Sequence, residues 1–327
     1  MSSPQLTIPP VAHFVWIGGR LSDLGWLAIQ MALDVGEFSK VRLWSQRDAL
    51  QRDQRIAVLL ATGRVELCDR ETLHQDDHAS AELDRLTRAG VSARLDALER
   101  ELTAPAAKAD LWRLRILWAQ GGVYLDADAL CLRSLGPLRA ARAFVGTERI
   151  ALPAGLYRSK NPLRWAKAGG LLALRHALTL RPGAGERFEA VQDWYDIACN
   201  NAVLGAMPRH PLIAQLLRMA AEMPPQRASR LYELGPRLLE EATGNCERHD
   251  LEVHPPLAFY PLPPEVCADY VAADPKGLLG RSPHPDAWVA HLYDSVLARR
   301  LGKPIDLAWL RTHRNTTLLG RMVEPWL

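Results

Sequence analysis

Two aspartates separated by a single residue, Asp126 and Asp128, follow an apolar segment in the stretch GGVYLDAD. Carboxylate oxygens are ligands that Mg²⁺ and Mn²⁺ prefer, and these ions usually share their coordination shell with phosphates and water. We expect one strand over VYLDADAL, in which side-chain alternation puts both carboxylates on the same face. The stretch therefore predicts a divalent-metal site at the end of a buried strand.

Other chemistries also place two aspartates this close together. An EF-hand loop counted from Asp126 needs glycine and glutamate where the chain has Cys131 and Pro137, so it is excluded. A phosphatase of the haloacid-dehalogenase type usually continues with Thr or Val, but Ala129 follows here, and the motif is not on the first strand. The motif alone leaves this phosphatase and a chance pair of exposed acids open.

The elements before the motif predict a parallel sheet. Apolar residues on both alternating faces of VAHFVWIGG (11–19) indicate a central strand covered on both sides. VRLWSQ and VELC are expected as further strands. Ser22 can cap a helix that reaches about Phe38, and Asp48 can cap a second helix that ends at Ala61. Alternating strands and helices are typical of an α/β fold.

A firm helix is expected directly before the aspartates. Residues 106–120 carry apolar side chains at helical spacing, namely Leu111, Leu114, Leu117 and Trp118. Gly121 and Gly122 then end this helix. Residues 71–105 are polar and helix-prone, so we expect a helical insertion that leaves the sheet.

The second half of the chain has a less regular pattern. RAFVG, IALPAGLY and the start of DAWVAHLYDSV are expected as strands. PLIAQLLRMAAEM and GPRLLEEATG are expected as helices, and LEVHPPLAFYPLPPEV as an extended, proline-rich segment. No linker divides the chain, so we expect one domain over residues 1–327.

Composition excludes several classes of protein. Hydrophobic residues make up 48% and charged residues 24%, and 40 Lys and Arg against 37 Asp and Glu leave a net charge of +3, without the basic stripe that a nucleic-acid partner requires. The five scattered cysteines form no C-x-x-C pair, which argues against a disulfide framework. No signal peptide and no apolar run of about 18 residues is present, so we expect a cytoplasmic protein. The basic tail RTHRNTTLLGRMVEPWL leaves peripheral membrane contact open, with a docked helix favoured.

The aspartate pair belongs to a longer pattern. An opening strand VAHFVWIGG, an A-x-D-x-x-R helix in AAKADLWRLRILWAQ and then GGVYLDAD follow one another along the chain. In this order and spacing they resemble the DXD-containing sugar-binding region of glycosyltransferases, shared by the large clostridial glucosylating toxins and related α-mannosyl- and α-N-acetylglucosaminyltransferases. The resemblance is close over residues 10–50 and 105–135 and faint over 190–295.

This resemblance implies a GT-A fold, with a Rossmann-like, mostly parallel central sheet, a helical insertion and additional C-terminal elements. It places the nucleotide-sugar site in residues 8–135 and the acceptor and closing part in residues 136–327. Binding at the ends of the strands also agrees with the switch-point rule for open α/β sheets. The residues expected to contact the nucleotide-sugar are Trp16, Ile17, Gly18, Asp110, Arg113, Tyr124, Asp126, Ala127, Asn200 and Asn201.

The resemblance also implies individual roles. Asp128 would bind Mn²⁺ or Mg²⁺ directly, and Asp126 would contact the ribose and the metal's shell. Asp110 and Arg113, which share a helix face, would hold the donor sugar's hydroxyls, with Arg113 near the phosphates; an ordinary surface ion pair is the alternative. These four acidic and basic residues are the expected catalytic set.

Three further assignments compete with structural explanations. Trp16 would stack on uracil, although a core tryptophan fits the sequence equally well. Asn200 and Asn201 are candidates for contact with the sugar, although adjacent asparagines are common in turns. His291 would be a third metal ligand or a phosphate contact, although a single histidine is often structural.

The resemblance therefore implies a metal-dependent, retaining glycosyltransferase that uses a nucleotide-sugar, with a UDP-sugar as the expected donor, and an unknown acceptor such as a glycan, glycolipid or protein. A phosphatase or phosphotransferase that uses the same aspartates is one alternative. A non-catalytic nucleotide-sugar-binding protein is the other. Composition rich in Ala, Leu and Arg favours a bacterial source.

Overall fold

The computed structural model describes residues 8–46, 50, 53–74, 77–87, 90–153, 155–156, 159–179, 184–243, 250–274, 277, 280 and 282–327. Its strands are β1 (Val11–Trp16), β2 (Lys40–Ser45), β3 (Val65–Cys68), β4 (Gly122–Leu125), β5 (Ala129–Cys131), β6 (Ala143–Ile150), β7 (Asp196–Ala206), β8 (Glu252–His254) and β9 (Val289–His291). Seven of them form one sheet in the order β3-β2-β1-β4-β7-β6-β8, and β5 and β9 form a separate ladder.

The large sheet is mostly parallel. Strands β3, β2, β1 and β4 pair in parallel, and β6 and β8 also pair in parallel. Strand β7 lies between β4 and β6 and is antiparallel to both, so it runs against the other described strands of this sheet. The expected α/β class with a mostly parallel central sheet is therefore confirmed.

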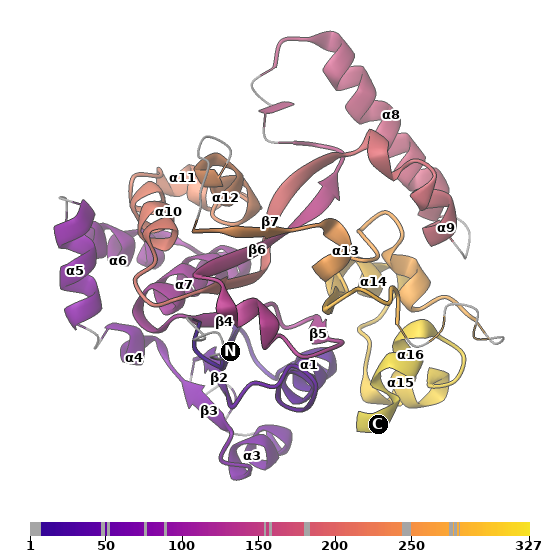
Figure 1. Ribbon diagram of the computed structural model, residues 1–327, viewed down its shortest axis with the longest axis horizontal. Coiled ribbons are helices and arrows are strands. Elements are labelled where there is room, and N and C mark those ends of the chain that lie inside the picture. Colours follow the sequence, from indigo (N-terminus) through magenta and orange to yellow (C-terminus); the bar gives the residue numbers. More distant parts are fainter. Residues whose placement is uncertain are drawn as a thin grey trace, which may run out of the picture.

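Helices cover both faces of this sheet (Figure 1). The helices are α1 (Asp23–Asp34), α3 (Gln54–Ala61), α4 (Arg70–His74), α5 (Asp77–Thr87), α6 (Val91–Glu101), α7 (Pro105–Gln120), α8 (Pro162–Thr179), α9 (Ala184–Glu189), α10 (Pro211–Ala221), α11 (Pro225–Ala228), α12 (Pro236–Thr243), α13 (Pro256–Phe259), α14 (Asp294–Leu301), α15 (Leu307–His313) and α16 (Leu318–Val323). Short 3-10 helices are η1 (Pro137–Ala140), η3 (Gln192–Trp194), η4 (Cys267–Tyr270) and η5 (Glu324–Trp326).

Two hydrophobic cores follow from side-chain alternation in the strands. Phe14, Val123 and Leu125 pack into one core with α1, α15 and α16. Val15 and Tyr124 point to the opposite side and pack with α7, α10 and α12. The expected burial of both faces of the first strand is confirmed, and the C-terminal tail is docked, because α16 lies in the first core.

Local sequence signals set several element boundaries. The Ser22 hydroxyl accepts a hydrogen bond from the Gly25 amide at the start of α1, as expected, but α1 ends at Asp34 rather than near Phe38. A Cβ at Gly36 would lie 2.7 Å from the Ala32 carbonyl oxygen, so the chain turns tightly there. Asp48 lies outside the described residues, and the helix that ends at Ala61 is capped by Asp53.

The prediction of one strand over VYLDADAL is wrong. Strand β4 ends at Leu125, and the Ala129 amide donates to the Asp126 carbonyl oxygen at 2.9 Å, which closes a turn over the two aspartates. Strand alternation therefore does not bring the carboxylates together. The turn does, because it directs the chain from the large sheet into the β5–β9 ladder.

Two other expected segments also differ. The described residues after Ile150 in IALPAGLY form bends and a helical turn instead of a strand, and this segment leads to α8. The proline-rich segment contains β8, but Pro256–Phe259 forms the short helix α13 rather than extended chain. Figure 1 shows α8 projecting from the sheet, beyond the ends of β6 and β7.

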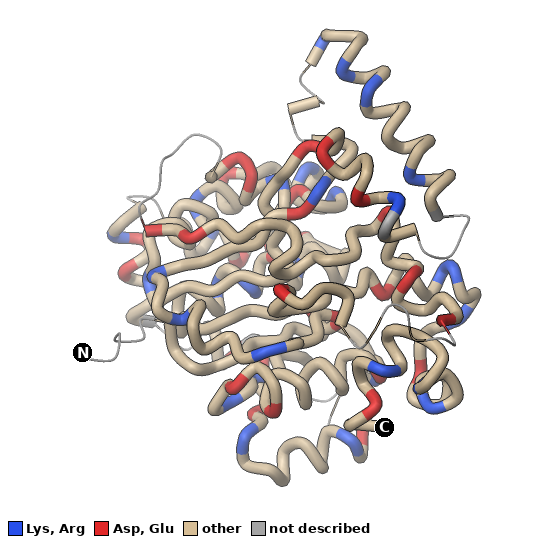
Figure 2. Tube along the Cα trace, turned by 45° about the vertical axis from the view of Figure 1, so that its right-hand side comes forward, with Lys and Arg blue, Asp and Glu red and all other residues tan. Residues whose placement is uncertain are grey.

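Charge is spread over the described trace. Figure 2 shows Lys and Arg interspersed with Asp and Glu over most of the described trace, whereas the projecting helix α8 carries basic residues and no acidic ones. Among the described residues, the search for helices long and apolar enough to cross a bilayer finds none.

The glycine pair before the aspartates is required by close packing. Gly121 has φ of 63° and Gly122 has φ of 99°. A Cβ on Gly121 would lie 2.6 Å from the Pro208 amide nitrogen. His13 fixes the same corner: it accepts from the Trp44 indole at Nδ1 (3.1 Å) and donates from Nε2 to the Gly121 carbonyl oxygen (2.8 Å). Burial lowers the pKa of this imidazole to about 3, so it is neutral.

We expect Gly121→Ala to be more destabilising than Gly63→Ala. Both glycines have positive φ (63° and 69°), but a Cβ at Gly63 has no atom within 4 Å, whereas one at Gly121 meets backbone atoms. The strained backbone alone costs about 1 kcal/mol, and the overlap at Gly121 adds about 1–3 kcal/mol. Urea unfolding of the two variants measures the difference. Equal midpoints would show that the packing around Gly121 is not tight.

Candidate active site

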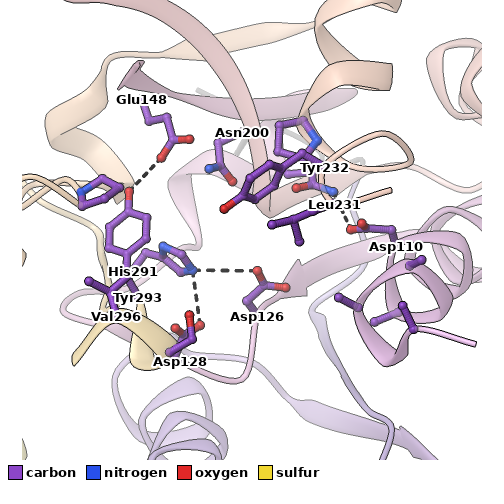
Figure 3. A pocket seen from close by; sticks show the side chains of 18 of the residues that line it. Asp110, Asp126, Asp128, Glu148, Asn200, Leu231, Tyr232, His291, Tyr293 and Val296 are labelled. Atoms are coloured by element: carbon purple, nitrogen blue, oxygen red, sulfur yellow. Dashed lines mark hydrogen bonds and ion pairs between the residues drawn. The ribbon is translucent and has the colours of Figure 1, made fainter. Parts of the chain in front are cut away.

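A cavity of about 590 Å³ opens at the carboxyl ends of β4 and β9, beside the middle of β7. Seven residues selected from the sequence line it: Asp110, Arg113, Asp126, Asp128, Asn200, Asn201 and His291. They come from α7, from the turn after β4, and from β7 and β9. Figure 3 shows the labelled side chains of this set pointing into one space.

Asp126, Asp128 and His291 can hold a metal ion. One ligand atom from each lies within 4.8 Å of the others, and His291 Nε2 is 3.2 Å from Asp128 Oδ1 and 3.8 Å from Asp126 Oδ2. The antiparallel β5–β9 ladder produces this arrangement, because it pairs His291 with Ala129, the residue after Asp128. The two carboxylates suit Mg²⁺ or Mn²⁺, and the imidazole nitrogen is accepted more readily by a transition metal such as Mn²⁺ than by Mg²⁺.

Arg113 lies between Asp110 and Asp126 and pairs with both. It is only 3% exposed, and its guanidinium lies 3.1 Å from Asp110 and 2.9 Å from Asp126. The guanidinium carbon is also 4.0 Å from the centre of the Tyr124 ring. Asp110 and Arg113 therefore share a helix face, as expected, but the pair is buried against β4 rather than on the surface.

The adjacent asparagines make different contacts. Asn201 Nδ2 donates to Asp110 Oδ1 at 2.9 Å, so this amide holds the carboxylate from the β7 side. Asn200 Oδ1 accepts from the Ala202 amide at 2.8 Å and from the Tyr260 hydroxyl at 3.2 Å. Both lie inside strand β7, not in a turn.

The pKa values of the three aspartates shift in different directions. Burial raises the pKa of Asp110 and of Asp126 above the usual value, in spite of Arg113. Burial acts in the same direction on Asp128, but the charge and hydrogen bond of His291 outweigh it, and the pKa of Asp128 is lowered. Burial would lower the pKa of His291, yet Asp128 and Asp126 together raise it to about 9.

Five of the predicted contact residues do not line the cavity: Trp16, Ile17, Gly18, Tyr124 and Ala127. The first three lie at the carboxyl end of β1, next to the carboxyl end of β4 in the same sheet. The Trp16 indole donates to the Gly19 carbonyl oxygen at 3.0 Å. Tyr124 is 1% exposed, and its hydroxyl donates to Asp126 Oδ1 at 2.9 Å, so it orients this carboxylate from inside the core.

Sequence reasoning missed much of the cavity wall. Glu148 of β6 accepts a hydrogen bond from the Tyr293 hydroxyl at 2.8 Å, and burial raises the pKa of Glu148. Further wall comes from Arg175 on α8 and from the turn that contains Leu231 and Tyr232. Of these residues, only Glu148 had a signal in the sequence. It is a carboxylate two residues after the expected strand RAFVG, just as Asp126 is a carboxylate that follows apolar strand residues.

A stretch in the first half of the chain matches a known family. Residues 44–145 match the family model described as "Glycosyltransferase sugar-binding region containing DXD motif". This region includes α7, β4 and the two aspartates, so the resemblance inferred from the motifs is confirmed. The match supports a glycosyltransferase, and the mostly parallel α/β sheet is the fold class expected from the resemblance.

Solved structures show distant likeness. One, "PaToxG Glycosyltransferase", is 16% identical, covers 98% of this chain and 87% of its own, and has a TM-score of 0.43. Another, the ligand-free glycosyltransferase domain of the YGT toxin, is 12% identical, covers 76% and 80%, and has a TM-score of 0.43. The UDP-bound form of that domain has 12% identity, the same coverage and a TM-score of 0.40. TM-scores below 0.5 add nothing to the assignment, and no curated protein sequence matches the chain.

In the metal-free protein, we expect His291 to titrate near pH 9, against 6.5 for a free side chain. Because the folded pKa is the higher one, the pairing stabilises the fold fully below about pH 6.5, and this contribution is lost as pH rises through about 9. NMR titration of the imidazole protons measures the pKa, with the signal assigned by its loss in His291→Gln. Asp128→Asn should lower the value. A wild-type pKa near 6.5 would contradict the ion pair.

Proposed function

We propose that this protein is a metal-dependent, retaining glycosyltransferase that transfers a sugar from a UDP-sugar to an acceptor. The observation that supports this most directly is the placement of Asp126, Asp128 and His291 beside Asp110 and Asn201 in one cavity. The first group offers hard donors for a cation, and the second offers hydrogen-bond acceptors and donors for hydroxyls. A nucleotide-sugar needs both, side by side.

The metal-binding residues in this proposal are Asp128, His291 and Asp126. A bound Mn²⁺ or Mg²⁺ would neutralise the charge that develops on the departing diphosphate. Two backbone contacts hold Asp128 ready: the Asp294 amide donates to its Oδ2 at 2.8 Å, and the Leu292 amide donates to its carbonyl oxygen at 3.0 Å. The carboxylate is thus oriented before any ligand arrives, which reduces the ordering cost of binding.

Asp110 and Asn201 are the proposed contacts of the transferred sugar. Asp110 already accepts from Asn201 and pairs with Arg113, and its remaining acceptor capacity faces the cavity. We assign Arg113 a positioning role, because a guanidinium this buried and paired with two carboxylates fixes those carboxylates more than it reaches a ligand. Asn201 is favoured over Asn200 for sugar contact, because Tyr260 and the strand itself occupy Asn200 Oδ1.

UDP is the proposed nucleotide, and Trp16 the proposed stacking partner for its base. Trp16 is partly buried at the edge where β1 and β4 end together, one strand away from the acidic cluster. The UDP-bound state of the YGT toxin domain is a property of that protein and agrees with this choice. We further propose that the described elements work as a single domain, with the acceptor bound on the side built from residues 136–327.

A phosphatase is not favoured. Its aspartate nucleophile must be free to attack phosphorus, but Asp126 is held by Arg113 and Tyr124, and Asp128 by His291 and a backbone amide. The family match also points to sugar transfer.

The purified protein should release UDP from one UDP-sugar in a panel of nucleotide-sugars when Mn²⁺ is present. EDTA should abolish this release, and Asp128→Asn should lower kcat/KM at least about 100-fold, since it removes a charged ligand beside the diphosphate. Coupled nucleotide-release assays measure the rates.

The matched control is Asp193→Asn. This acid has a side chain 90% exposed and pairs with Arg149 outside the cavity, so its amide variant should keep wild-type rates. Release that persists in EDTA, or an Asp128→Asn enzyme as fast as wild type, would refute the metal-dependent mechanism. NMR of the released sugar's anomeric proton decides between retention and inversion.

Trp16→Ala should weaken UDP binding about tenfold, because the loss of one stacked aromatic ring costs ~1–3 kcal/mol. Calorimetry with UDP and Mn²⁺ measures the affinity. Trp194→Ala, which removes an equally large but 58% exposed ring outside the cavity, is the control. Unchanged affinity in Trp16→Ala would mean that the indole only packs against the core.

A further inference from the structure

The turn between α11 and α12 presents an aromatic ring at the cavity in an unusual way. Tyr232 lies in this turn with φ of 71°, in the left-handed region that bulky residues rarely adopt. Its side chain is 56% exposed although it lines the cavity, and the neighbouring Leu231 is 65% exposed. The fold therefore accepts a strained backbone without burying the ring that it displays, and strain of this kind is concentrated at ligand sites.

The residues next to Tyr232 hold the turn rigidly. Glu233 is 7% exposed and accepts from Arg227 at 2.6 Å and from Arg237 at 2.5 Å. The Arg237 amide also donates to the Tyr232 carbonyl oxygen at 3.1 Å. Because two arginines fix the next residue and the backbone itself is bonded, the protein sets the backbone position from which the Tyr232 ring extends before a ligand binds.

The same turn packs against the residues proposed to bind sugar hydroxyls. A Cβ at Gly235 would lie 2.7 Å from Asn201 Nδ2 and 3.0 Å from Asp110 Oδ2, so the backbone of the turn touches this pair. Figure 3 shows the Tyr232 ring over the space between Asn200 and Asp110. The Tyr232 hydroxyl has no hydrogen-bond partner among the described residues, and the side chain is more than half exposed, so both the ring face and the hydroxyl are available to a ligand.

We propose that Tyr232 is a stacking platform for a pyranose ring. A pyranose has an apolar face of C–H groups that packs on an aromatic ring, and a rim of hydroxyls that Asp110 and Asn201 can bond. A nucleobase is less suitable here, because hydroxyl-binding groups surround the ring and the proposed base-binding residue, Trp16, is outside the cavity lining. This inference rests on the proposed function, and the pyranose can belong to the donor or to a sugar acceptor.

Kinetics of Tyr232→Ala separate these two sources. The first assay is hydrolysis of the active UDP-sugar with Mn²⁺ and no acceptor, together with the Kd for UDP. If the ring stacks on the donor sugar, KM rises about tenfold while the Kd for UDP stays at the wild-type value. The second assay measures acceleration of UDP release by methyl glucosides, galactosides and mannosides. If the ring stacks on the acceptor, hydrolysis is unchanged and that acceleration is lost.

Controls keep the test specific. Tyr232→Phe retains the ring and should restore the affected parameter, and Trp194→Ala removes an exposed aromatic outside the cavity and should change neither assay. Tyr232→Gly removes the ring and relieves the positive φ. It should therefore change the same kinetic parameter as Tyr232→Ala, but its Tm should be about 2 °C higher than that of Tyr232→Ala. This pair separates loss of a ligand contact from loss of folding.

Two results would overturn the proposal. The first is a Tyr232→Ala enzyme with wild-type values in both assays, whether or not a methyl glycoside accelerates the wild type. The second is a Kd for UDP that weakens as much as KM, which would place the base on the ring. A wild-type enzyme that releases UDP from no sugar nucleotide would instead refute the proposed function, and this outcome is visible before any variant is made.

Discussion

The buried guanidinium of Arg113 is the interaction on which the site depends. Removing an arginine from water is costly unless carboxylates compensate for the lost hydration. Asp110 comes from one turn earlier on α7, and Asp126 comes from the end of β4, so the compensation ties a helix to a strand. The Tyr124 ring and hydroxyl complete the enclosure. Arg113 thus holds both acids at the wall of the same cavity.

A second long-range contact completes the charge balance. Asp126 and Asp128 are close enough to repel each other, and His291 reduces this repulsion when it is protonated. The β5–β9 ladder brings it there, since three paired residues fix its position opposite Ala129. The His291 ring also packs against Tyr293, whose hydroxyl reaches Glu148 on β6. Contacts among the turn after β4, the β9 region and β6 thus link His291 to the acidic residues of the cavity.

The features that could be predicted from the sequence are those set by neighbouring residues, such as strands, helix caps and helix ends. Strand β3, the Ser22 cap and the helix that ends at Gly121 follow from periodicity and capping within a few residues. The turn over the aspartates was missed because the alternating pattern VYLDADAL fits a straight strand, and only pairing with β9 shows that the chain leaves the sheet. The motif order was enough to select Asp110, Arg113 and Asp126, whereas His291 came from the fainter resemblance over residues 190–295. Tyr232 could not be found, because its neighbours in the cavity lie far away in sequence, and the signal for Glu148, a carboxylate near a strand, does not say which residues it faces.

The division between matched and unmatched sequence explains why the motifs describe the donor and say nothing of the acceptor. The family match ends at residue 145 and contains the aspartates and the α7 residues. Asn201, Tyr232 and His291 come later and reach the cavity through β7, a strained turn and the small ladder. Metal and sugar-nucleotide chemistry is the same for many acceptors, so its residues can be common to a family. Residues that face an acceptor must differ with it, so a model of the shared region cannot contain them.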